Sequence, residues 1–184
     1  MISTNACDGF DHLLRRGIKN HLLDQNSDSC EILVMDDLTS TQQPHLAVLT
    51  ISSHLFRLMV FIHFASDEPT RVHMAKLSNT SFNDMNERVF MDAICERANM
   101  FCGALSRDLA LSFPHIGMST PNIVDRRCMS HLHLLNLAHV RHLKVDVNNS
   151  ASFHVTLCVN DYDELDFLVD KSAVDVDSGA LELF

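Results

Sequence analysis

The strongest constraint in this sequence is a helical pattern over residues 83–108. Its apolar residues recur at the spacing of one helix face, and at about 100° per residue they fall within a single stripe. The residues of this stripe are Phe90, Ile94, Ala98, Phe101, Leu105 and Leu109. The pattern therefore predicts a long helix and fixes which of its sides faces the core.

The opposite side of the predicted helix carries a second stripe, formed by Asp92, Glu96, Asn99 and Gly103. A polar outer stripe is also typical of a merely solvated helix face, and that interpretation stays open. However, Asn and Gly weaken a helix interior relative to Ala, by roughly 0.5 and 1 kcal/mol. Gly103 also leaves bare backbone that another molecule can approach closely. The outer stripe is therefore a candidate functional surface.

Length and charge limit the kinds of protein that this chain can be. A length of 184 residues suits one domain with short extensions. The formal charge of −10 disfavours nucleic acid and an anionic membrane surface as partners. No apolar run reaches the ~18–20 residues of a membrane span, and the first residues lack the pattern of a signal peptide. The six cysteines are dispersed, which is typical of reduced cysteines, so we expect a cytoplasmic protein.

Alternating and helical patterns predict the remaining elements. We expect helices over 8–24 and 68–77, and a hairpin of strands 46–51 and 55–64. Further strands are expected over 31–35, 122–128, 132–147 and 152–160. The strand over 132–147 would place His133, Leu135, Leu137 and His139 on one face. Residues 161–184 are acidic, and we expect them to form an extension, either with a short helix or partly disordered.

The outer stripe matches a known motif. The pattern Asp92-x3-Glu96-x2-Asn99, with Gly103 four residues after Asn99 and Pro121 further downstream, resembles the signature of the CheC/CheX/FliY-type phosphatases of bacterial chemotaxis. The segment 116–124 also resembles that family, and the resemblance covers about 46–159. Because we find no second Glu-x2-Asn helix, the chain is most similar to the single-site CheX branch.

The resemblance implies that the chain hydrolyses the aspartyl phosphate of a CheY-type response regulator. By this likeness, Asn99 would position the attacking water, and Glu96 would contact the active-site Lys of the regulator. Asp92, Gly103 and Pro121 would shape the partner-binding surface. Positioning accounts for much of the catalysis in phosphoryl transfer, and an amide can accept and donate hydrogen bonds at the same time. The chain would bring no metal or cofactor, because the regulator supplies the Mg²⁺.

The patterns and the resemblance together predict an α+β fold, with an antiparallel sheet of about five or six strands and two long helices on one face. Residues 1–28 would form an N-terminal helix and linker, 29–160 the CheX-like domain and 161–184 the acidic extension. The family's single-site branch forms dimers by strand pairing across subunits. We therefore expect a homodimer that pairs through an exposed edge of the strand over 132–147.

Other functions remain open. The chain could be a non-catalytic CheX-like binding module in chemotaxis, flagellar or two-component signalling, or an unrelated ligand-binding α+β domain. Intact Glu96 and Asn99 favour the enzyme, because a pure binding module has no need for the amide. The spacings His131-x-His133 and His139-x2-His142 would suit zinc on a strand, but they lack a convincing third or fourth ligand. We therefore predict no metal site.

Overall fold

The computed structural model of the chain describes residues 1–39 and 41–170. It confirms the α+β class, and neighbouring strands of the sheet run antiparallel. The helical segments are α1 (Thr4–His21), α2 (Glu68–Leu77), the short 3-10 helix η1 (Phe82–Asp84), α3 (Glu87–Ala110) and the 3-10 helix η2 (Arg126–Leu135). The strands are β1 (Cys30–Met35), β2 (His45–Ser52), β3 (Phe56–Phe64), β4 (Gly117–Met118), β5 (Asn122–Asp125), β6 (His139–Val147) and β7 (Ala151–Asp161).

All seven strands belong to one sheet. Its order is β1-β6-β7-β3-β2-β4, and β5 pairs with β2 as well, at the opposite end of that strand from β4. The sheet exceeds the expected five or six strands because β4, only two residues long, is not among the predicted strands. β2 and β3 form the predicted hairpin, with His45 opposite Phe64 and Ser52 opposite Arg57.

Capping side chains set the helix starts. α2 spans the predicted residues, and the Asp67 carboxylate accepts a hydrogen bond from Thr70 N at 3.0 Å. Asn86 caps α3 in the same way, accepting from Val89 N at 3.1 Å. The guanidinium of Arg71 then ties α2 to this start of α3. It donates to the Met85 carbonyl at 2.9 Å and lies 4.9 Å from the centre of the Phe90 ring.

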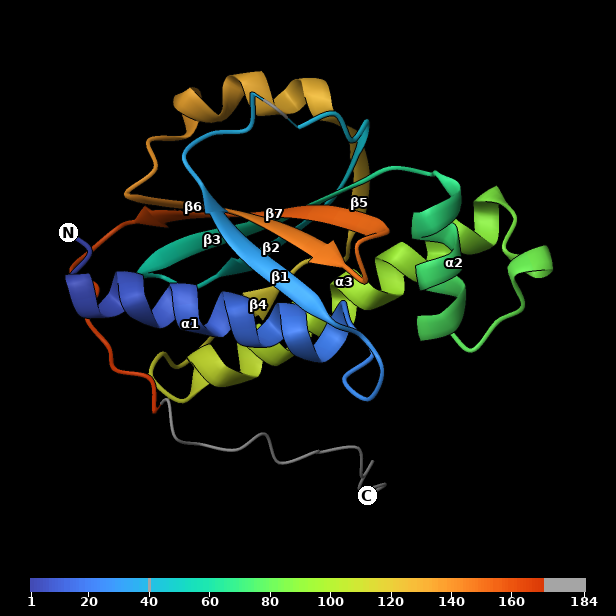
Figure 1. Cartoon of the computed structure of the whole chain (residues 1–184). Coiled ribbons are helices and arrows are strands. Elements are labelled where there is room, and N and C mark those ends of the chain that lie inside the picture. The colour runs from blue at the N-terminus through green and yellow to red at the C-terminus, as the bar shows by residue number, and fades with distance from the viewer. Residues whose placement is uncertain (40, 171–184) are drawn as a thin grey trace.

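The two long helices, α1 and α3, cover the same face of the sheet, as predicted (Figure 1). Aromatic rings of both helices pack edge to face on the sheet. The ring centres of Phe10 in α1 and Phe56 in β3 are 5.9 Å apart, and those of Phe90 in α3 and Phe64 in β3 are 5.8 Å apart. All six residues of the predicted apolar stripe of α3 are buried. We call this side of the sheet the helical face. It contains the main core.

We call the other side of the sheet the second face; it is covered by η2 and not by a long helix (Figure 1). Its small core consists of Leu46, Met59, Phe61 and Cys158, against which parts of η2 and of the segment after it pack. The predicted strand over 132–147 is wrong in its first part, because residues up to Leu135 belong to η2 and β6 begins only at His139. His133 and Leu135 therefore do not lie on a strand.

The position of β6 also corrects the expected dimer interface. β6 lies between β1 and β7, so both of its edges are already paired within the chain. Cys30 pairs with Val147 and Met35 with His142, which places β1 at this end of the sheet. The strand over 132–147 therefore offers no free edge to a second copy.

The chain continues beyond β7 along α1. Leu165 and Phe167 are buried, and Ile2 forms a parallel bridge with Leu165. We expected either a short helix or partial disorder in the acidic extension, and residues 162–170 contain no helix. The rest of that predicted extension, including Asp175, Asp177 and Glu182, lies outside the described residues. None of the helices within 1–39 and 41–170 combines the length and apolar character needed to cross a membrane.

Candidate functional site

The predicted outer stripe lies along the exposed side of α3. Asp92, Glu96 and Asn99 are exposed, and Gly103 is partly exposed. The outward orientation of these four residues follows from the buried stripe, because burying one side of a helix exposes the residues on the opposite side. The helix is long and its inner side is packed, so it forms a firm platform for side chains on its outer side.

Within residues 1–39 and 41–170, the two central side chains of the stripe make no polar contact. Among the described residues, neither Glu96 nor Asn99 has a side-chain hydrogen bond or ion pair, and both are exposed. Asp92 lies 3.9 Å from Arg88 one turn earlier, an exposed pair that contributes little to stability. A carboxylate and an amide are therefore available to another molecule on one face, separated by less than one turn.

The neighbouring groups leave the charge and chemistry of the stripe intact. Arg97 follows Glu96 in sequence, but its guanidinium donates to the Leu77 carbonyl at the end of α2 and so points away from Glu96. Cys95 is the nearest thiol. Burial, together with the negative charge of Asp92, raises the pKa of Cys95 above its usual value. This thiol therefore stays protonated near pH 7 and is not an activated nucleophile.

In the described part of the chain, Gly103 has no neighbour that explains the absence of a side chain. A Cβ built on Gly103 would meet only Arg107 Nη1, at 3.8 Å, which is an ordinary contact distance. The glycine therefore leaves open backbone on the outer face of α3, in line with the sequence interpretation.

Pro121 lies apart from the stripe, on the edge of the sheet between β4 and β5. The ladder is interrupted there, since proline has no N–H to donate. Ser119 bridges the gap through hydrogen bonds with the backbone of Thr50, at 2.9 and 3.0 Å. Because Asn122 pairs with Val48, Pro121 lies close to the level of Leu49, about halfway along β2.

The ends of α3 are held near the two ends of the β2–β3 hairpin. Phe90 contacts Phe64, which pairs with the first residue of β2, and Phe113 contacts Phe56 near the last. The middle of α3, with Glu96 and Asn99, thus runs at roughly the same level of the sheet as Pro121. The structure joins four of the predicted residues on one surface and places Pro121 on the neighbouring sheet edge.

A groove between α1 and α3 borders the stripe on its other flank. Among the residues that line it are Arg16, Met100, Ala104, Arg107 and Leu111. Met100, which follows Asn99 in sequence, is 42% exposed and lines this groove. The sequence gives no signal for these flanking residues, because the groove exists only once α1 is docked.

The histidines considered as zinc ligands are engaged elsewhere or exposed. His139 Nε2 lies 2.9 Å from Asp11 Oδ1, and His142 Nδ1 lies 2.9 Å from Thr156 Oγ1. His131 and His133 are exposed on η2. Within residues 1–39 and 41–170, no group of three or more His, Cys, Asp or Glu side chains is arranged to hold a metal ion.

Comparison with solved structures defines the class of fold. CheX in the CheX–CheY–BeF3–Mg²⁺ complex from Borrelia burgdorferi aligns with a TM-score of 0.59 and 11% identity, over 84% of this chain and 97% of that chain. A CheC-like protein from Shewanella oneidensis aligns with a TM-score of 0.57 and 14% identity, over 85% and 98%. CheX from Vibrio vulnificus aligns with 0.54 and 17%, over 82% and 96%.

These likenesses show that the chain has the fold of CheX and CheC-like chemotaxis proteins, as the motif predicts. The sequence identity to these three proteins is only 11–17%. No protein-family model matches this chain, and no curated protein matches it by sequence.

Proposed function

We propose that this protein is a phosphatase that hydrolyses the aspartyl phosphate of a CheY-type response regulator. Asn99 positions the attacking water, and Glu96 binds the active-site Lys of the regulator. Asp92, Gly103 and Pro121 belong to the surface on which the regulator docks. The observation that carries the proposal is the outer stripe of α3, where Glu96 and Asn99 are exposed and unengaged on a packed helix.

In this reaction the main task of the chain is to position the attacking water. The phosphoryl group passes through a loose transition state, so the attacking water needs orientation more than a strong base. The amide oxygen of Asn99 can accept a hydrogen bond from that water, while its nitrogen donates nearby. Glu96 lies about 4.5 Å along the helix axis from Asn99, which lets both side chains reach one bound partner. The Mg²⁺ would come with the phosphorylated regulator.

Three further observations support the proposal. Gly103 leaves backbone open beside the two side chains, so a partner can approach the helix closely. Arg97 is held by Leu77 and does not neutralise Glu96. The fold is shared with a CheX protein whose solved structure is a complex with CheY.

The test is the decay of a phosphorylated CheY-type regulator from the same cell, measured with and without this protein. We expect faster decay with the native chain and a loss of about 100-fold in that acceleration with Asn99→Ala. Glu96→Ala should weaken binding of the regulator. Asn5→Ala removes an exposed amide from α1 and serves as a matched control that keeps full activity.

Two results would contradict the proposal. Binding without faster decay would identify a docking module instead of an enzyme. If the native chain and a well-folded Asn99→Ala variant accelerated the decay equally, Asn99 would have no role in the hydrolysis.

We also propose that the protein forms a homodimer, and that β1 is the strand that pairs. β1 lies at the end of the sheet and contains neither Lys nor Pro, residues that commonly protect an edge. Leu33 and Val34 of this strand are 44% and 52% exposed. Sedimentation at increasing concentration should show a dimer that Leu33→Lys converts to monomer. A native chain that stays monomeric at all concentrations would overturn this proposal.

A further inference from the structure

Three histidines from three different strands gather on the second face of the sheet. His63 of β3 pairs directly with His154 of β7, and their ring centres lie 6.4 Å apart. His142 of β6 pairs with Thr156, two residues further along β7. His63 and His154 are buried and His142 is half-buried, so the sheet register brings together residues that are distant in sequence.

One hydroxyl links two of these rings. Thr156 Oγ1 lies 3.2 Å from His63 Nε2 and 2.9 Å from His142 Nδ1. Because a hydroxyl has one proton, it can donate to one ring while it accepts from the other. This arrangement needs a ring nitrogen without a proton. Two imidazolium rings would both be donors and would leave the hydroxyl proton without its acceptor.

The remaining ring nitrogens also favour neutral imidazoles. Nδ1 of His63 and Nδ1 of His154 are buried and have no hydrogen-bond partner among the described residues. Protonation would place a positive charge and an unsatisfied N–H at each of these positions, which is costly in a buried environment. Burial accordingly lowers the pKa of all three histidines, that of His63 to about 3.

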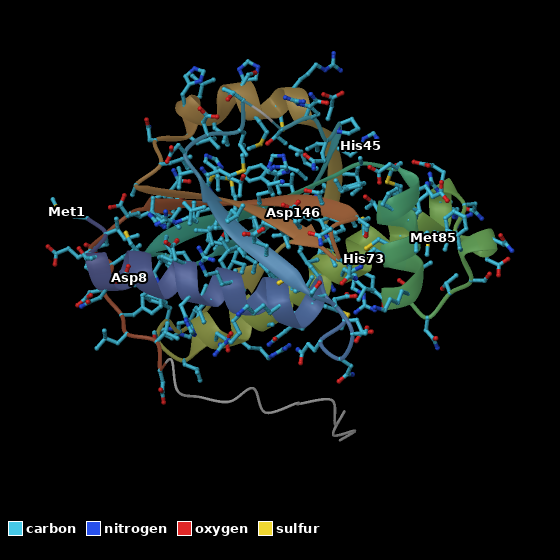
Figure 2. The ribbon with its side chains drawn as sticks, in the orientation of Figure 1. Met1, Asp8, His45, His73, Met85 and Asp146 are labelled. Carbon is cyan, nitrogen blue, oxygen red and sulfur yellow. The ribbon has the colours of Figure 1, made fainter. Side chains whose placement is uncertain are left out.

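The charged groups around the cluster are mixed in sign. Arg126 at the start of η2 opposes protonation of His63, and Arg141 opposes that of His142. Asp37, on the connection from β1 to β2, favours the charged form of His142. At His154 the neighbours Lys144 and Asp146 act in opposite directions. On β1, Glu31 lies opposite Asp146, which is labelled in Figure 2.

The structure above these strands is held by hydrogen bonds at its two ends: Arg126 N donates to the Pro44 carbonyl at 3.0 Å, and Ala138 N donates to the Val159 carbonyl at 2.8 Å. We define the cover as residues 126–138, which comprise η2 and the turn to β6. No residue of η2 is fully buried, and 3-10 helices of this length are uncommon because their hydrogen bonds are strained. At its end, Asn160 Nδ2 donates to the carbonyls of Leu135 and Asn136, the latter at 3.1 Å. The cover packs over Cys158, which is fully buried.

We propose that the cluster of His63, His142 and His154 is a proton-operated latch for this cover. Neutral rings keep the second face closed. When the rings bind protons the cover lifts, while the helical face with α1 and α3 stays folded. The geometry carries the proposal: two of the rings share the Thr156 hydroxyl, the third lies against His63, two buried ring nitrogens have no partner among the described residues, and no residue of the cover is fully buried.

The direction of the pH effect follows from linkage. In the closed state the histidines bind protons less readily than their ordinary pKa of 6.5 would allow. The stability of the closed state is therefore fully present above pH 7 and falls as the pH drops through 6.5. Between pH 7.5 and 5.5 the open population rises by about tenfold for each histidine that becomes protonated only after opening.

Two cysteines provide an internal comparison for the test. Cys158 lies beneath the cover, and Cys102 lies in the main core on the helical face; burial raises the pKa of each thiol to about 12. The full chain would be treated with 4,4′-dithiodipyridine, which reacts at acid pH, and each cysteine would be quantified by mass spectrometry. Rates would be normalised to the denatured chain at the same pH. We expect Cys158, but not Cys102, to react faster at pH 5.5 than at pH 7.5.

Substitutions identify the groups responsible. His142→Gln and His154→Gln should each reduce the pH response by about tenfold. His131→Gln removes an exposed histidine of η2 and should leave the response unchanged. Amide hydrogen exchange in the native chain gives an independent readout that needs no variant: residues 126–138 should lose protection on acidification before α3 does.

Three outcomes would overturn the latch. The two cysteines could become reactive together, which would indicate global unfolding. Cys158 could react at the same normalised rate at both pH values. The full pH response could also persist in the folded His142→Gln and His154→Gln variants.

Discussion

Two helix-interior glycines, Gly17 of α1 and Gly103 of α3, have opposite surroundings. A Cβ on Gly17 would lie 2.6 Å from the Phe101 ring, so the absence of a side chain lets α1 pack closely on α3. A Cβ on Gly103 would meet only the tip of Arg107 at 3.8 Å. Among the residues that the structure describes, Gly17 thus has a packing reason and Gly103 has none. A glycine that weakens a helix without a packing reason indicates a surface used by another molecule.

The largest effect is expected for Phe101→Ala, which tests the inner face of α3. Phe101 is fully buried, and its loss should lower the free energy of unfolding by about 3–5 kcal/mol. Urea denaturation would measure this change. A loss below about 1 kcal/mol would mean that the contact between α1 and α3 is not tightly packed.

A smaller loss is expected for Gly17→Ala. The new methyl group would overlap the Phe101 ring, and overpacking of this kind costs about 1–3 kcal/mol. The same substitution in a Phe101→Leu background should cost less, because the two positions are in contact. Equal losses of stability in the two backgrounds would show that the effect of Gly17→Ala does not come from contact with Phe101.

The smallest effect on stability, and the opposite sign, is expected for Gly103→Ala. The position is open, so alanine should raise the free energy of unfolding by about 0.5–1 kcal/mol through helix propensity. Binding of the regulator should weaken at the same time if its surface approaches this backbone. A more stable variant with unchanged affinity would leave Gly103 outside the docking surface.

Much of the helical face could be predicted from sequence, because its information is local. The period of the buried stripe defines α3, although this helix begins at Glu87, after the Asn86 cap, and not at residue 83 as predicted. The outer stripe follows from the same period, which is why Glu96 and Asn99 could be located. The groove beside Glu96 and Asn99, and the position of Pro121 relative to α3, could not be predicted. Both depend on how α1 and the β4–β5 edge pack in the folded protein.

The second face shows why local patterns fail. The alternation of His and Leu over residues 131–135 favours a strand, but Met129, Leu132 and Leu135 recur every third residue. That spacing places them on one side of a 3-10 helix, where they cover the small core of the second face. A similar limit applies to the histidine cluster, because only the pairing of β3, β6 and β7 brings those residues together.

The pairing of β1 with β6 has a consequence for how the chain folds during synthesis. β1 leaves the ribosome about a hundred residues before the strand that completes its pairing. At ordinary rates of elongation this interval lasts roughly 5–20 s. During that time β1 lacks the strand with which it pairs, whereas α1 already has β3 and α3 to pack against. The complete sheet can therefore form only after β6 and β7 have emerged, and until then the edge of β1 is unpaired.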